Sequence, residues 1–201
     1  MKREFDEAVL ADLGRCANAT FGEYQMVKMA VEHDMRHLKS YMKDINEDSE
    51  LLLAPATTKV RYEPLGVCAI YSAWNYPIMG ALKPLVQCIT TGNAAIVKPS
   101  EIAPETSKVI KKFIDRCLDI QFYRCIEGGV DVAVELNKAP LDLICFTGST
   151  QVGKIVAQAA AKNLTKCILE LGGKCPGIIH PSADIGFAAD KVCWAKFSNA
   201  G

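Results

Sequence analysis

The stretch LELGGK, residues 169–174, ends an apolar run on a carboxylate followed by two glycines. A carboxylate among apolar neighbours is costly to desolvate, and Glu170 at the end of such a strand would suit a general base. A strand-end glutamate that points into solvent explains the pattern equally well. The residues alone therefore leave Glu170 open as either a catalytic base or a solvated side chain.

The stretch AWNYP, residues 73–77, places Asn75 after an apolar run and just before a proline that can start a helix. A carboxamide held at this point could donate a hydrogen bond to an oxyanion that develops during a reaction. An asparagine that simply makes a turn is the commoner use of this residue type. Asn75 is thus a candidate oxyanion donor with a plainer alternative.

The stretch CFTGSTQVGK, residues 145–154, is typical of a strand, a turn and the start of a helix. Gly148 would let the backbone approach a ligand, Ser149 would lie at the helix start, and Gly153 would allow close packing. The pattern matches neither G-x-G-x-x-G nor the P-loop. It indicates either a phosphate site at a helix N-terminus or an ordinary turn whose Ser or Thr caps the helix.

The stretch VKPSE, residues 97–101, also leaves an apolar strand and places Lys98 and Glu101 at the same predicted sheet edge. Such charged residues could contact a ligand, although charged loop residues are usually only solvated.

The pair His33 and His37 has the i, i+4 spacing of a helical metal site, but lacks the glutamate of the zinc-protease motif and a nearby third ligand. We predict no metal site.

Composition favours a small-molecule ligand. The 201 residues carry 23 basic and 23 acidic side chains, so no net positive field favours nucleic acid. Nine cysteines without a C-x-x-C pair indicate free thiols in a reducing compartment, and we predict a cytoplasmic protein. The sequence begins without the apolar core of a signal peptide, and no uninterrupted apolar run of membrane-spanning length occurs within these residues.

Short apolar runs alternate with helical patterns after an N-terminal helical segment. Residues 1–46 are predicted to be helical, with a second long helix starting near Gly22. Beyond them, we expect strands at 59–73, 94–98, 121–126, 142–146, 165–171 and 177–180, and helices at 77–90, 104–119, 130–137, 151–162 and 184–197. This order predicts a doubly wound α/β fold with a mostly parallel, Rossmann-like sheet, and ligands at the carboxyl ends of its strands. We expect a helical segment at 1–50 and a dinucleotide-binding α/β domain at 51–201.

Taken in order, these motifs resemble the aldehyde dehydrogenase superfamily. The stretches that carry the resemblance are EPLGVCAIYSAWNYP, TGNAAIVKPSE, FTGSTQVGK, LELGGK and KFSNAG. RHLKSYMK and LLLAPA look most like the class 3 branch, which includes the fatty aldehyde dehydrogenases. The resemblance implies NAD(P)-dependent oxidation of an aldehyde to a carboxylic acid, a homodimer in the full-length form, and no nucleic-acid partner.

The resemblance also implies a role for each candidate residue. Asn75 matches the donor to the oxyanion, and Glu170 matches the general base that activates thiol or water. The cofactor would be NAD or NADP, and Glu101 would favour NAD. The residues that match its binding site are Lys98 and Glu101 at the adenosine ribose, Gly148 and Ser149 under the pyrophosphate, Gly153 in helix packing, and Leu171 at the nicotinamide amide.

The family's nucleophilic cysteine lies in F-x-N-x-G-Q-x-C, three residues past the glycine that matches Gly201. We therefore expect the chain to be truncated at the start of the catalytic domain, and to be inactive by itself because none of its nine cysteines occupies that position. A short, non-catalytic nucleotide-binding or dimer-partnering protein is the alternative.

Overall fold

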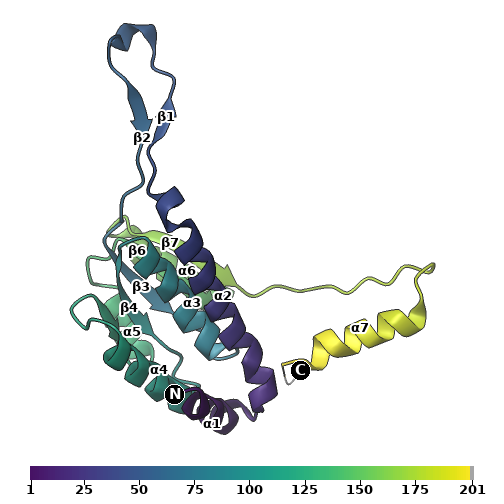
Figure 1. Cartoon of the computed structure of the whole chain (residues 1–201). Coiled ribbons are helices and arrows are strands. Elements are labelled where there is room, and N and C mark those ends of the chain that lie inside the picture. The colour runs from purple at the N-terminus through teal and green to yellow at the C-terminus, as the bar shows by residue number, and fades with distance from the viewer. Residues whose placement is uncertain (200–201) are drawn as a thin grey trace.

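A five-stranded parallel sheet forms the centre of the computed structural model, which describes residues 1–199 (Figure 1). Its strand order is β5, β4, β3, β6, β7. The strands are β3 (Val67–Tyr71), β4 (Ala94–Lys98), β5 (Tyr123–Cys125), β6 (Leu143–Gly148) and β7 (Lys166–Leu171). From β3 the chain first adds β4 and β5 on one side and then β6 and β7 on the other. The strand order therefore reverses between β3 and β6, the point at which open α/β sheets bind ligands.

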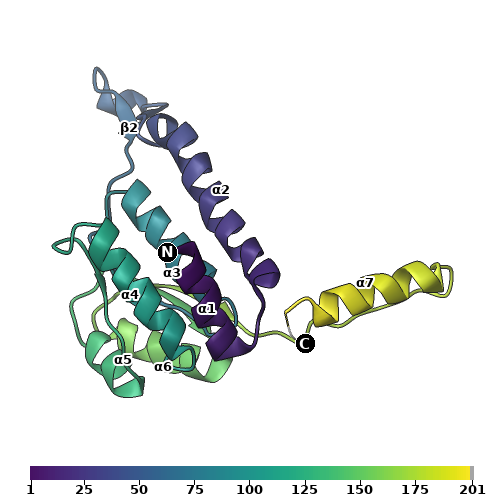
Figure 2. The ribbon, with the colours of Figure 1, turned by 60° about the horizontal axis from the view of Figure 1, so that its bottom comes forward.

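Helices cover both faces of this sheet, which confirms the doubly wound fold predicted from the sequence (Figure 2). One face carries α1 (Lys2–Leu13), α3 (Pro77–Thr90) and α4 (Pro104–Cys117), with α2 (Ala17–Tyr41) packed outside α3. The other face carries α5 (Val130–Leu136) and α6 (Thr150–Ala161).

The central strand β3 is buried on both of its faces. Cys68 and Ile70 contribute to the core under α3 and α4, whereas Ala69 and Tyr71 contribute to the core under α5 and α6. Successive side chains of a strand point to opposite faces, so a strand covered on both sides must be apolar throughout. This requirement explains the continuous apolar run of β3.

The helix α1 is tied to α4 by a cap. The carboxylate of Asp12 accepts hydrogen bonds from the backbone amides of Glu105 (3.1 Å) and Thr106 (2.7 Å), in the first turn of α4. These amides have no partner within their own helix, so the contact satisfies them. The N-terminal helices thus pack directly on the α/β layer.

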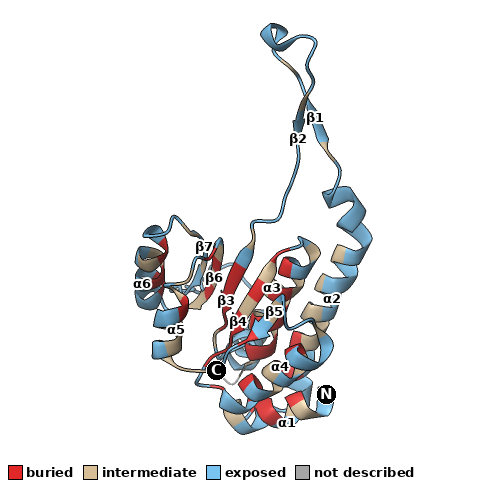
Figure 3. Ribbon diagram, turned by 90° about the vertical axis from the view of Figure 1, so that its left-hand side faces the viewer, coloured by how far each residue is buried: buried red, intermediate tan, exposed pale blue. Residues whose placement is uncertain are grey.

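The predicted strand at 59–73 is wrong, because the structure contains two strands there. Thr58–Val60 forms β2, which pairs with β1 (Ile45–Glu47) in an antiparallel hairpin, and β3 begins only at Val67. Gly66 separates them with a φ of +130°, a backbone conformation that a strand does not use. The hairpin carries the 3-10 helix η1 (Leu51–Leu53), projects from the body and is mostly exposed (Figure 3). The second helix begins at Ala17 rather than near Gly22.

The predicted strand at 177–180 is also wrong. Residues 172–184 form no helix or strand, and no strand among residues 1–199 pairs with Ile178 or Ile179. This exposed segment leads to α7 (Ile185–Phe197) (Figure 1). The helix α7 has no buried residue. Gly201, on which the expected truncation depends, lies outside the described residues. Within residues 1–199, no helix is long and apolar enough to cross a membrane.

We expect Gly66→Ala to lower the free energy of unfolding by about 2 kcal/mol. A Cβ at residue 66 would overlap the Asp142 Oδ2 atom, which accepts a hydrogen bond from the Val67 amide at 2.7 Å. Urea denaturation measures the change. Gly22→Ala is the control, because a Cβ there meets nothing within 4 Å and helical alanine is stabilising by up to about 1 kcal/mol. Equal or greater stability of Gly66→Ala would contradict the prediction.

Candidate functional site

A cleft of about 610 Å³ opens at the carboxyl ends of β3, β4, β6 and β7. It lies at the reversal of strand order, where this class of fold binds ligands. The structure brings seven of the eight sequence-predicted site residues to its walls: Asn75, Lys98, Glu101, Gly148, Ser149, Glu170 and Leu171. The eighth, Gly153, lies behind the wall and supports it.

The ion pair of Lys98 and Glu101 forms one wall. The buried Lys98 ends β4, and its Nζ donates to the Glu101 Oε2 atom at 3.1 Å and to the Pro99 carbonyl at 3.3 Å. Partial burial alone would raise the pKa of Glu101, but its own backbone amide and Lys98 together hold that pKa below its ordinary value. The wall therefore presents a carboxylate that is ionised at neutral pH and accepts hydrogen bonds.

The turn between β6 and α6 forms the floor. Ser149 caps α6, and its Oγ atom accepts a hydrogen bond from the Val152 amide at 3.3 Å. The capping alternative for this residue is thus correct, and Ser149 nevertheless also faces the cleft. The free amides of the first turn of α6 make the floor favourable to an anionic group.

Gly153 packs α6 against β7. A Cβ at residue 153 would lie 2.6 Å from the Cδ2 atom of Leu171, and this glycine is buried. The absence of a side chain therefore sets how closely the helix approaches the strand that carries Glu170 and Leu171. This contact agrees with the packing function expected for Gly153.

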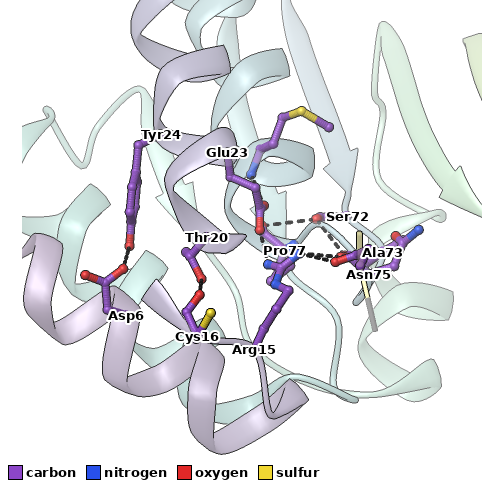
Figure 4. Close-up of polar contacts among 12 residues, drawn as sticks. Asp6, Arg15, Cys16, Thr20, Glu23, Tyr24, Ser72, Ala73, Asn75 and Pro77 are labelled. Carbon is purple, nitrogen blue, oxygen red and sulfur yellow. Dashed lines mark hydrogen bonds and ion pairs between the residues drawn. The ribbon is translucent and has the colours of Figure 1, made fainter. Parts of the chain in front are cut away.

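Asn75 lies in the loop between β3 and α3 and is one of the residues that line the cleft. The Ser72 amide donates to the Lys98 carbonyl at 3.1 Å, which continues the β3–β4 pairing into this loop. Pro77 then begins α3. The carbonyl oxygen of Asn75 is held by Arg15 (3.2 Å) and Asn199 (3.2 Å), so its carboxamide extends from an anchored backbone (Figure 4).

Glu170 lies opposite Thr147 in the β6–β7 pairing and lines the cleft, but it is exposed. The expectation that apolar neighbours desolvate this carboxylate is wrong for residues 1–199, because β7 is the edge strand of the sheet. A carboxylate in this position remains available to remove a proton from a group that enters the cleft.

Sequence patterns alone missed two parts of the site. Ile102, Val130, Ala133 and Val152 add apolar surface to the cleft, and the apolar periodicity of α5 and α6 was the signal available for three of them. A buried ion pair between Arg15 and Glu23 lies behind Asn75. Nothing in the sequence distinguishes these two charged residues from those on a solvated helix.

His33 and His37, the pair with the spacing of a metal site, are exposed and lie one turn apart on α2. The rings of His33 and His37 stack at a centroid distance of 4.3 Å, and the Nδ1 atom of His37 lies 2.8 Å from the His33 carbonyl. In the described part of the chain, no group of three or more His, Cys, Asp and Glu side chains could hold a metal ion.

The combined walls suit an elongated ligand that carries anionic, hydroxyl and flat apolar groups. The first turn of α6 favours the anion, Glu101 can accept from hydroxyls, and the apolar residues of α5 and α6 can cover a flat ring. Asn75 and Glu170 supply a hydrogen-bond donor and a carboxylate to the same cleft.

Comparison with known proteins agrees with this chemistry. The family model "Aldehyde dehydrogenase family" matches residues 1–201. The 4,4'-diaponeurosporen-aldehyde dehydrogenase of Staphylococcus aureus is 38% identical over 97% of this chain and 43% of its own length. Aldehyde dehydrogenase family 3 member A2 of Mus musculus is 38% identical over 100% of this chain and 42% of its own length. The chain thus spans about two fifths of the length of these relatives.

Solved structures of aldehyde dehydrogenases have the same fold as this chain. The substrate-bound state of Staphylococcus aureus AldH superposes with a TM-score of 0.95 at 37% identity, over 99% of this chain and 44% of that one. Betaine aldehyde dehydrogenase of the same organism, in complex with NAD+, gives 0.84 at 27% identity, over 93% of this chain and 38% of that one. The family and branch predicted from the motifs are confirmed, and the chain belongs to the aldehyde dehydrogenase family.

Proposed function

We propose that the whole protein oxidises aldehydes to carboxylic acids with NAD or NADP as the acceptor. The observation that carries the proposal is the single cleft that collects Asn75 and Glu170 together with Lys98, Glu101 and Ser149. The family membership supports it, and the structure of betaine aldehyde dehydrogenase in complex with NAD+ supports the cofactor. The short, non-catalytic alternative has no specific observation in its favour.

The residues of the cleft fit a dinucleotide. The first turn of α6, with Gly148 and Ser149, would hold its pyrophosphate, and Lys98 and Glu101 would hold the adenosine ribose. The backbone of Leu171, whose side chain packs at Gly153, would position the nicotinamide amide. The nicotinamide supplies the hydride acceptor for the reaction. A ribose with two free hydroxyls suits the Glu101 carboxylate, so we propose a preference for NAD that does not exclude NADP.

Two residues act on the substrate in this proposal. The carboxamide of Asn75 donates to the carbonyl oxygen of the aldehyde, where negative charge develops once a nucleophile adds to the carbonyl carbon. The carboxylate of Glu170 removes the proton from the attacking thiol or, later, from the water that hydrolyses the thioester. Both residues line the cleft, which supports these roles.

We propose that none of the nine cysteines in residues 1–201 is the nucleophile. Among the residues described by the structure, no cysteine lines the cleft. Burial raises the pKa of the Cys125 thiol to about 12 and also raises the pKa of Cys145, which disfavours their thiolates. Residues 1–201 by themselves would then bind cofactor without oxidising aldehydes.

All nine cysteines are free thiols, which supports our proposal of a cytoplasmic, reducing location. The homodimer rests on the family resemblance alone.

The proposed function is tested on the protein at its native length. The purified protein is mixed with short and long aldehydes and with NAD or NADP, and formation of reduced cofactor is followed by absorbance together with carboxylic acid by chromatography. We expect both products in equal amounts. Absence of turnover with every aldehyde, in a protein shown to bind the cofactor, would contradict the proposal.

We expect Glu101→Gln to weaken NAD binding about tenfold and to weaken NADP binding less, because the substitution removes the ionised acceptor at the ribose. Calorimetric titration of both cofactors measures the change in dissociation constant. Glu105→Gln is the matched control, because Glu105 pairs with Lys108 on α4 and does not line the cleft. An equal loss for both cofactors, or no loss, would contradict the assignment of Glu101.

A further inference from the structure

Two oppositely charged side chains are buried behind the loop of residues 72–76, between β3 and α3, which we call the Asn75 loop. Arg15 is 5% exposed and lies between α1 and α2, and Glu23 is 2% exposed on α2. The Nη2 atom of Arg15 donates to Glu23 Oε1, and Glu23 Oε2 accepts from the Met79 amide at 2.8 Å in the first turn of α3 (Figure 4). Removing two charges from water is costly, and such a pair does not by itself indicate stability.

The other terminal nitrogen of the Arg15 guanidinium, Nη1, forms hydrogen bonds with the Asn75 loop and with Asn199. This atom donates to the carbonyl oxygen of Asn75 at 3.2 Å and to the Oδ1 atom of Asn199 at 2.6 Å. Asn199 in turn donates from Nδ2 to the same carbonyl at 3.2 Å. The guanidinium also lies 5.6 Å from the ring centroid of Tyr76. One planar group thus joins α2, the Asn75 loop and the end of α7.

These contacts fix the backbone from which the Asn75 carboxamide extends. Two donors hold the carbonyl of Asn75, and the Glu23 carboxylate holds the Met79 amide four residues later. An oxyanion donor acts only when its N–H lies within hydrogen-bond distance of the charge that develops, and displacement by about 1 Å can cost about 100-fold in rate.

We propose that Arg15 is a positioning residue. Together with Glu23 and Asn199, it fixes the backbone of the Asn75 loop so that the Asn75 carboxamide reaches the substrate oxygen. This inference rests on the proposed function. It predicts that Arg15 contributes to turnover through Asn75, and not through cofactor binding, because neither Arg15 nor Glu23 lines the cleft.

The test compares Arg15→Lys, Asn75→Ala and the double variant in the protein at its native length. Lysine keeps the charge opposite Glu23 but loses the planar fork that reaches several acceptors. We expect Arg15→Lys to lower kcat about 10- to 100-fold and to leave the cofactor dissociation constant within about twofold. In the double variant, kcat should equal that of Asn75→Ala alone within about twofold, because the two residues act as one unit.

Two further variants separate positioning from folding. Arg3→Lys is the matched control, since Arg3 pairs with Glu7 on the exposed face of α1, and it should leave kcat unchanged. Asn199→Ala removes one donor to the Asn75 carbonyl and one acceptor of Arg15, but Arg15 stays paired with Glu23. We therefore expect this variant to fold and to lower kcat in the same direction as Arg15→Lys. If Arg15→Lys does not fold, Asn199→Ala and its double variant with Asn75→Ala take its place.

Either a kcat of Arg15→Lys within about twofold of the native value, or losses that multiply in the double variant, would overturn the inference. If the native protein oxidises no aldehyde, the proposed function is wrong, and the kinetic comparison cannot be made. Amide hydrogen exchange then still decides whether Arg15 holds the loop: at the Met79 amide it should rise at least about tenfold in Arg15→Lys. Unchanged exchange there would overturn the inference independently of activity.

Discussion

We expect Asn75→Ala to lower the turnover number of the native-length protein by about 100- to 1,000-fold, the range seen when one oxyanion donor is removed. The residue lines the cleft, and its backbone is anchored by Arg15 and Asn199. The donated hydrogen bond strengthens as charge develops on the aldehyde oxygen, so its loss affects the transition state more than the bound substrate. The KM for the aldehyde should therefore change much less than kcat.

Steady-state kinetics with one aldehyde and saturating cofactor measure this loss. Asn163→Ala is the control, because Asn163 is exposed in the turn after α6 and lies outside the cleft. The cofactor dissociation constant should be unaffected in both variants. A loss of less than about fivefold in Asn75→Ala would exclude an oxyanion role for this side chain.

Glu170→Gln should lower kcat by about 100- to 10,000-fold, the usual contribution of a general base. Glutamine keeps the size of the side chain and one acceptor oxygen but cannot accept a proton. Because Glu170 is exposed on an edge strand, the substitution should leave the free energy of unfolding within about 0.5 kcal/mol of the native value.

A rapid-mixing experiment shows which step depends on this carboxylate. If Glu170 activates the thiol, the first turnover slows; if it activates only the hydrolytic water, a burst of reduced cofactor remains and later turnovers slow. Glu135→Gln is the control, since Glu135 lies on α5 and pairs with Lys138, two residues beyond the end of that helix. Native burst and steady-state rates in Glu170→Gln would contradict both roles.

The parallel core could be predicted from the sequence because β4 and β6 are short apolar runs that end at glycine, proline or polar residues. Burial on both faces makes such strands visible without knowledge of their partners. The strand at 177–180 failed for the same reason: Ile178 and Ile179 satisfy the apolar pattern, but hydrogen bonding to a neighbouring strand, which the pattern does not report, is absent among residues 1–199. The break before β3 was visible in the sequence, because Glu63, Pro64 and Gly66 interrupt the apolar pattern there.

The candidate site was predictable to the extent that its residues follow strands. Lys98, Ser149 and Glu170 each lie at or just after a strand end, and parallel strands bring those ends to one edge. Arg15 was not predictable, because it contacts Asn75 across 60 residues of sequence through the packing of α2 on α3. The exposure of Glu170 depends on β7 being an edge strand, which local sequence does not indicate.

A crystal structure of the native-length protein with NAD+ tests the central claim most directly, namely that this one cleft holds the cofactor between the two reacting side chains. The account predicts pyrophosphate oxygens at the first turn of α6, ribose hydroxyls within about 3 Å of the Glu101 carboxylate, and the nicotinamide between Asn75 and Glu170. NAD+ bound outside the cleft, or bound in it with the nicotinamide remote from both Asn75 and Glu170, would contradict the account.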